Sequence, residues 1–141
     1  MKKLLVILII LVSIDSHAKT FNPKQLIGTK WQRVESFSDP TIKWEFSKEE
    51  IKETVNRAIL NKTASSKRKY YFSPTIPAKF DRNKVGKDEK GKYLVYYNDK
   101  SKRMSYYRIE VLSNDTLKFW HEANPEAIGD VSCYVLYKRI P

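Results

Sequence analysis

The chain has 141 residues, a formal net charge of +11, a single cysteine and two histidines. A lone cysteine excludes an internal disulfide, the four glycines form no glycine-rich phosphate loop, and no His, Cys and carboxylate residues cluster with the spacing of a zinc site. The composition therefore predicts a protein that is stabilised by core packing and carries neither a cofactor nor a metal.

The first 18 residues have the pattern of a cleavable export signal. Lys2 and Lys3 precede an apolar run over residues 4–12, and Ser16-His17-Ala18 places small residues where a signal peptidase cleaves. The run is shorter than the roughly 20 residues that span a bilayer, and no second apolar span follows. We therefore expect a mature, periplasmic or secreted domain over residues 19–141, without a transmembrane segment. An uncleaved N-terminal anchor is the alternative.

Residues 41–47 form the clearest predicted strand. Ile42, Trp44 and Phe46 alternate with Lys43, Glu45 and Ser47, so one face of the strand is expected to be buried.

The next segment, residues 48–60, has an ambiguous pattern. Ser47 and Glu50 have the spacing of a helix capping box, and Ile51, Val55 and Ile59 recur every four residues. This pattern favours a short helix near residues 48–60, with a strand pair that turns near Asn56 as the alternative.

Further strands are predicted by aromatic and β-branched residues at 69–73, 92–97, 104–112, 116–120 and 132–140. Pro74 and Pro77 predict an irregular or edge segment after the first of these, because proline cannot donate to a central ladder. Short turn signals at 88–91, 98–101 and 113–115 require antiparallel neighbours. The sequence thus predicts an all-β antiparallel meander, and closure into a barrel would remove its exposed edges.

Several segments resemble the small lipocalin-like proteins exported by bacteria of the Bacteroides type. They are Leu26-Ile27-Gly28-Thr29-Lys30-Trp31, Trp44-Glu45-Phe46, Tyr70-Tyr71-Phe72-Ser73, Gly91-Lys92-Tyr93 and Asn114-Asp115-Thr116-Leu117. The resemblance implies a barrel of about eight strands with room for one small ligand, and it reads residues 49–60 as strand. It also implies that Trp31 closes the base of the barrel beneath Arg139, although the Gly28-x-x-Trp31 spacing is one residue longer than in lipocalins.

Catalytic equipment is sparse after the predicted cleavage. His121 and Cys133 are the only histidine and cysteine beyond residue 18, and we interpret them as a strand-end residue and a buried thiol. We therefore predict a non-enzyme.

The first functional hypothesis is a barrel that binds a small apolar or amphipathic ligand. Small-molecule sites are concave and rich in aromatic side chains, so the candidate ligand-binding residues are aromatic: Trp44, Phe46, Tyr71, Tyr93 and Tyr107.

The alternative hypothesis is a basic module that docks an acidic protein, a polysaccharide or a membrane surface. Residues 62–103 contain 13 Lys or Arg against 4 Asp or Glu, and a regional excess of this kind attracts anions. The candidate basic patch comprises Lys67, Arg68, Lys69, Lys84 and Lys87. Basic and aromatic residues together also suit single-stranded nucleic acid, but an exported protein rarely meets it, so no nucleic-acid partner is predicted.

Overall fold

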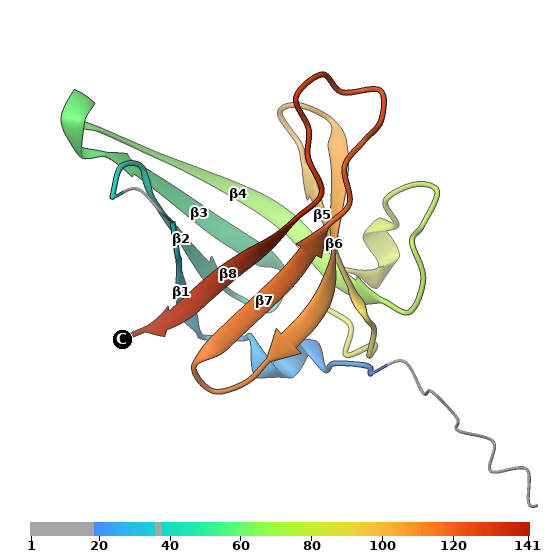
Figure 1. Cartoon of the computed structure of the whole chain (residues 1–141). Coiled ribbons are helices and arrows are strands. Elements are labelled where there is room, and N and C mark those ends of the chain that lie inside the picture. Colours follow the sequence, from blue (N-terminus) through green and yellow to red (C-terminus); the bar gives the residue numbers. More distant parts are fainter. Residues whose placement is uncertain (1–18, 36–37) are drawn as a thin grey trace, which may run out of the picture.

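Eight antiparallel strands close into a barrel in a computed structural model that describes residues 19–35 and 38–141 (Figure 1). The predicted export signal lies outside the described residues. The strands are β1 (Lys30–Arg33), β2 (Thr41–Phe46), β3 (Glu50–Arg57), β4 (Lys62–Ser73), β5 (Tyr93–Asn98), β6 (Arg103–Leu112), β7 (Thr116–His121) and β8 (Cys133–Ile140). Three single 3-10 turns complete the elements: η1 (Pro23–Gln25), η2 (Ala58–Leu60) and η3 (Arg82–Lys84).

Each strand pairs with the next one along the chain, and β1 pairs with β8 to close the ring. Trp31 lies opposite Trp44 on β2 and opposite Arg139 on β8, so the first strand joins the second and the last. The predictions of an all-β meander and of a barrel with about eight strands are confirmed. Within the described residues, no helix is long and apolar enough to cross a bilayer.

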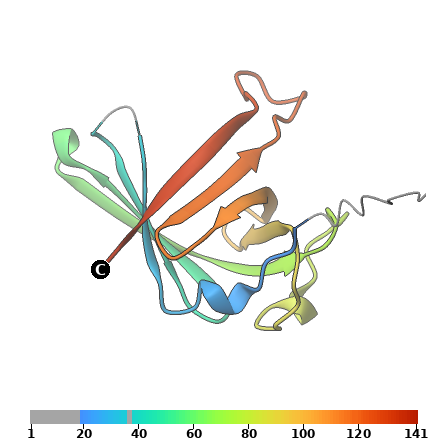
Figure 2. The same ribbon diagram turned by 60° about the horizontal axis from the view of Figure 1, so that its bottom comes forward.

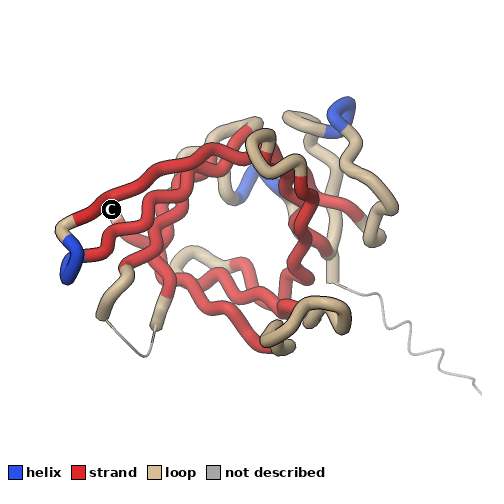
Figure 3. Tube along the Cα trace, turned by 90° about the horizontal axis from the view of Figure 1, so that it is seen from above, coloured by secondary structure: helices blue, strands red, loops and turns tan. Residues whose placement is uncertain are grey.

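The up-and-down topology gives the barrel two different ends (Figures 2 and 3). We call the end that carries the β1–β2, β3–β4, β5–β6 and β7–β8 connections the mouth, and the other end the base. The segment with η1 crosses the base. There Phe21 forms an isolated bridge with Gly91, Leu26 is fully buried, and the backbone N–H of Gly28 donates to the Phe46 carbonyl over 2.8 Å.

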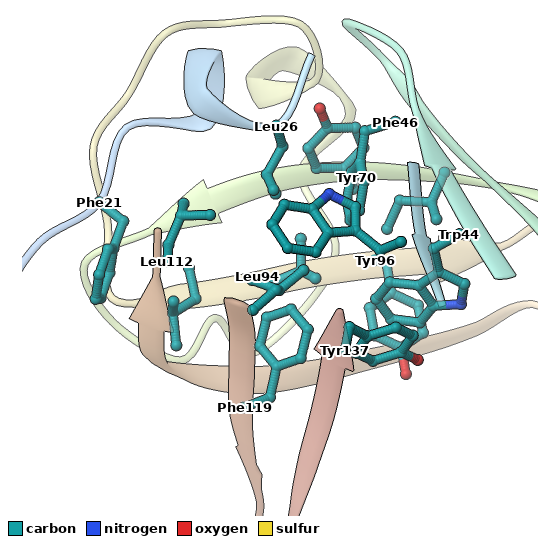
Figure 4. Packing of buried hydrophobic residues seen from close by; sticks show 14 of the residues in the cluster. Phe21, Leu26, Trp44, Phe46, Tyr70, Leu94, Tyr96, Leu112, Phe119 and Tyr137 are labelled. Atoms are coloured by element: carbon teal, nitrogen blue, oxygen red, sulfur yellow. The ribbon is translucent and has the colours of Figure 1, made fainter. Parts of the chain in front are cut away.

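The interior is filled mainly by aromatic side chains (Figure 4). Trp44, which is 2% exposed, packs 4.8 Å from the ring of Tyr137 and 6.0 Å from those of Tyr96 and Phe119. Phe46 and the partly buried Ile42 share its face of β2, as the alternating pattern predicts. Edge-to-face and tilted contacts at these spacings are favourable arrangements of aromatic rings. The middle of the barrel is therefore a packed core.

The predicted helix over residues 48–60 is wrong, because β3 occupies most of the segment. The Ser47 hydroxyl does accept the Glu50 backbone N–H, over 3.0 Å, but it does so in the turn between β2 and β3. Ile51 and Val55 are four residues apart, and an even spacing also places them on one face of a strand. Glu53 lies between Ile51 and Val55 in the sequence and shares their face of the strand. In a helix it would lie on the opposite side from both, so its position distinguishes a strand from a helix.

The long connection between β4 and β5 packs on the outside of the barrel. Phe80 lies between Tyr71 and Tyr97, with ring centroids 5.0 and 5.1 Å apart. This cover explains why both faces of β4 are buried near the base, where Tyr70, Tyr71, Phe72 and Ser73 are all buried. The irregular segment predicted from Pro74 and Pro77 is confirmed.

Candidate functional site

A cavity of about 630 Å³ opens at the mouth, between β5, β6, β7 and the β7–β8 connection. We call it the mouth cavity. Its lining combines aromatic, polar and charged side chains, among them Tyr96, Arg103, Ser105, Tyr107, His121 and Asp130. Pockets of this size commonly hold small molecules.

Strand alternation brings the wall of the mouth cavity together. Tyr107 pairs with Leu94 across β5–β6, and Tyr96 pairs with Ser105, so these side chains share the inner face. The Tyr107 ring stacks on Phe119 at 5.2 Å and meets His121 edge-on at 5.8 Å. Burial raises the pKa of Tyr96, so its phenol remains protonated as a neutral hydrogen-bonding group.

Asp130 fastens the β7–β8 connection over the cavity. Its Oδ2 accepts the Asn124 backbone N–H over 2.8 Å, and its Oδ1 lies 2.7 Å from His121 Nε2. The hydrogen bond from the Asn124 backbone lowers the pKa of Asp130 most, and the bond to His121 lowers it further. The carboxylate therefore stays charged at neutral pH. The loop is thus tied to the end of β7.

A charged pair lies inside the barrel next to this cavity. Arg68 Nη2 donates to Glu53 Oε1 over 2.8 Å, and both side chains are mostly buried, with 20% and 16% exposed. Trp44 Nε1 donates to Glu53 Oε2 over 2.7 Å, and the Arg68 guanidinium lies 5.5 Å from the centre of the Tyr96 ring.

The Nε atom of Arg68 is buried and finds no hydrogen-bond acceptor among the described residues. An unsatisfied buried donor is costly, and Arg68 is not among the residues that line the mouth cavity.

The five predicted ligand-binding aromatics lie in different places. Trp44 and Phe46 are buried in the core, and Tyr71 is buried beneath the β4–β5 connection. Tyr93 lies on the outer side of β5, in a row with Arg108 of β6 and Trp120 of β7. Tyr107 alone among the five lines the mouth cavity.

The two predicted base residues are direct neighbours across the β1–β8 ladder. Trp31 is fully buried and donates from Nε1 to the Thr29 hydroxyl over 2.7 Å. Arg139 is exposed and donates to the Asn114 carbonyl over 3.3 Å, in the turn between β6 and β7.

The predicted basic patch divides between two faces of β4. Lys67 and Lys69 lie on the outer face, each within 4 Å of Glu50, whereas Arg68 points into the barrel. Lys84 pairs with Glu89 over 3.7 Å in the β4–β5 connection, and Lys87 follows it there as an exposed residue.

Cys133 is exposed at the start of β8, so the prediction of a buried thiol is wrong. It pairs with His121 across the β7–β8 ladder, at the mouth end of both strands. His121 is the last residue of β7, as predicted.

Sequence reasoning missed the inward-facing pair of Glu53 and Arg68. The signal was present, because Glu53 shares the strand face of Ile51 and Arg68 shares that of Tyr70. A charged residue on an apolar strand face is a candidate for a buried pair.

These features define the protein as a closed eight-stranded antiparallel barrel with a solvent-accessible cavity at one end. No group of three His, Cys, Asp or Glu side chains in the described part of the chain is placed to hold a metal ion. Comparison with models of protein families, with curated protein sequences and with solved structures found no match.

Proposed function

We propose that this protein binds a small amphipathic molecule in the mouth cavity and catalyses no reaction. The observation that carries the proposal is the 630 Å³ cavity, walled by Tyr96 and Tyr107 and lined also by Arg103 and His121.

The side chains that line the mouth cavity indicate which class of ligand it can bind. Tyr96 and Tyr107 offer aromatic surface to an apolar body, and Arg103 and His121 offer hydrogen bonds to a polar group.

The polar groups of the cavity support binding rather than catalysis. His121 Nε2 is engaged by Asp130 at 2.7 Å, and among the described residues no hydrogen bond involves the Cys133 thiol. An activated nucleophile needs a base within hydrogen-bond reach.

The test uses the amphipathic dye 1-anilinonaphthalene-8-sulfonate as the probe. Ser105→Trp places a bulky ring inside the cavity and is expected to weaken dye binding at least tenfold, measured by fluorescence titration. Ser101→Trp adds the same ring on the exposed β5–β6 turn, outside the cavity lining, and serves as the matched control.

Native mass spectrometry of the protein from its own host provides the second readout. A co-purifying small molecule that Ser105→Trp removes and Ser101→Trp retains is the expected result. Equal dye binding by both variants, with no co-purifying molecule, would rule out the mouth cavity as a ligand site.

We also propose that the chain is exported and that the mature protein begins at Lys19, on the basis of the pattern over residues 1–18. N-terminal sequencing of the protein from its host tests this. Recovery of Met1 in a membrane fraction is the contrary result.

A further inference from the structure

The most exposed apolar side chains of the described residues gather at the mouth. The five large ones that are more than half exposed are Ile59, Leu60, Ile128, Val131 and Tyr134, with Ile59 at 83% and Ile128 at 105%. Ile59 and Leu60 form the tip of the β3–β4 hairpin, and Ile128 and Val131 belong to the β7–β8 connection. Both tips project from the same end of the barrel (Figure 1). Scattered exposed apolar residues are ordinary, but a one-sided distribution marks an interaction surface.

The β3–β4 tip is held in an ordered conformation. Asp39 accepts the backbone N–H groups of Ala58 and Ile59, over 2.9 and 3.3 Å. Asn61 has a left-handed backbone (φ 49°) and donates its N–H to the Ala58 carbonyl over 3.0 Å. These bonds fix the η2 turn, so Ile59 is held toward solvent by the surrounding structure.

Two exposed cations flank this tip. Arg57 precedes the η2 turn and Lys62 follows it. Within residues 19–35 and 38–141, neither forms an ion pair. Their charge is therefore available to an external anion.

The acidic groups of the mouth lie mainly on its other tip. The β7–β8 connection carries Glu122, Glu126 and Asp130 and no Lys or Arg, and the hydrogen bonds that Glu122 and Asp130 accept leave their charges in place. Asp39, which accepts two backbone N–H groups of the η2 turn, is the carboxylate at the β3–β4 tip. With Arg57 and Lys62 against Asp39, the β3–β4 tip keeps a positive charge, whereas the tip that carries Ile128 is negative.

We propose that the β3–β4 tip docks on an anionic lipid bilayer. Ile59 and Leu60 insert at the boundary between headgroups and acyl chains, while Arg57 and Lys62 contact lipid phosphates. We call this surface the mouth rim, made of Arg57, Ile59, Leu60 and Lys62. Apolar side chains beside a basic surface are the features that hold proteins in the membrane interface.

The shape of the mouth rim favours a bilayer over a protein partner. A stable protein interface buries about 800 Å² on each side around a packed centre, whereas the β3–β4 tip is a narrow hairpin that stands apart from the other connections of the mouth (Figure 1). A second copy of the chain would bring Arg57 and Lys62 against the same two cations. A bilayer accepts isolated protruding side chains.

The experiment measures co-sedimentation of the full chain with phosphatidylcholine vesicles, with and without phosphatidylglycerol. We expect binding to require phosphatidylglycerol and to weaken with salt, because exposed charges are screened. The double variant Arg57→Glu, Lys62→Glu should lower the partition coefficient on anionic vesicles at least 25-fold, since each cation contributes roughly fivefold. Ile59→Ser, Leu60→Ser should lower it at least tenfold. All variants keep the parent's N-terminus, so any contribution from that segment cancels.

The matched control is Ile76→Ser, Lys79→Glu, which changes an exposed apolar and an exposed basic residue in the β4–β5 connection. It should bind vesicles like the parent, and circular dichroism should show all variants folded. Vesicle binding that the rim variants leave unchanged would overturn the proposal, as would equal losses in the control. If the parent does not bind vesicles but self-associates, and Ile59→Ser, Leu60→Ser abolishes the association, a second copy covers the rim and the lipid proposal is wrong.

Discussion

The pair formed by Glu53 and Arg68 makes the sharpest prediction about stability. In Glu53→Gln the side chain keeps its size and can still accept the Trp44 Nε1 proton, but Arg68 loses its counter-ion. Removing one partner of a buried ion pair costs about 3–5 kcal/mol. Because the two side chains remain 20% and 16% exposed, water screens part of the charge, and we expect the lower end of this range. The free energy of unfolding should therefore fall by about 3 kcal/mol.

Two further variants separate charge from hydrogen bonding. Glu53→Ala also removes the acceptor of the 2.7 Å bond from Trp44 and should cost about 1 kcal/mol more than Glu53→Gln. Arg68→Met in the Glu53→Gln background removes the unpaired cation and should restore about 2 kcal/mol.

Urea denaturation followed by tryptophan fluorescence gives these free energies. The loss in Glu53→Gln should persist in about 1 M salt, since buried charges are screened little. A loss below about 1 kcal/mol in Glu53→Gln would refute the claim that the pair is buried. If the losses of the single variants Glu53→Gln and Arg68→Met sum to the loss of the double variant within about 0.5 kcal/mol, the two side chains are not coupled.

Three other predictions follow from the described contacts. Trp44→Ala should destabilise the protein by about 3–5 kcal/mol in urea, because its ring is 2% exposed among other aromatic rings; a loss under about 1 kcal/mol would contradict that burial. Gly91→Ala should cost about 1–3 kcal/mol in thermal unfolding, because a Cβ atom there would lie 2.4 Å from the Ser73 carbonyl carbon; unchanged stability would mean that the bridge to Phe21 shifts freely. Asp130 has a lowered pKa, so its contribution is present above the ordinary Asp pKa of about 4 and is lost as the pH falls below it. The protection factor of the Asn124 amide, which compares its exchange rate with that of an unstructured chain at the same pH, should accordingly fall in acid, and Asp130→Asn should lower it already at neutral pH. A protection factor that is independent of both pH and the substitution would contradict this role.

Alternation of apolar and polar residues predicted most of the strands correctly. It failed where a four-residue spacing was compatible with both a helix and a strand. Residues 41–47 alternate cleanly, and β2 forms there. Ile51 and Val55 are four apart, a spacing common to a helix face and a strand face, and the Ser47 contact that caps helices also closes a tight turn. Pairing of β3 with β2 and β4, which no local window contains, decided the outcome.

The candidate site was less accessible to sequence reasoning, because it depends on strands that are distant in the chain. Lys67, Arg68 and Lys69 look like one basic cluster, but a strand directs Arg68 inward while its neighbours face out. Tyr107 was predicted from its chemistry alone. Its neighbours His121 and Asp130 come from β7 and from the loop that follows, and only the barrel geometry brings them together.

The seam between β1 and β8 has a consequence for how the chain folds. Lys30 pairs with Ile140, so closure joins residues separated by nearly the whole described chain. Contacts of such long range make folding slow, since the entropy of ordering the intervening chain is lost before the contact forms. A nascent chain that ends before residue 133 has no β8, which leaves β1 and β7 as open edges that can pair with other chains. The barrel can therefore close only after β8 has been synthesised, and removal of a few residues from β8 should lower the folding yield far more than loss of an equal length from any loop at the mouth.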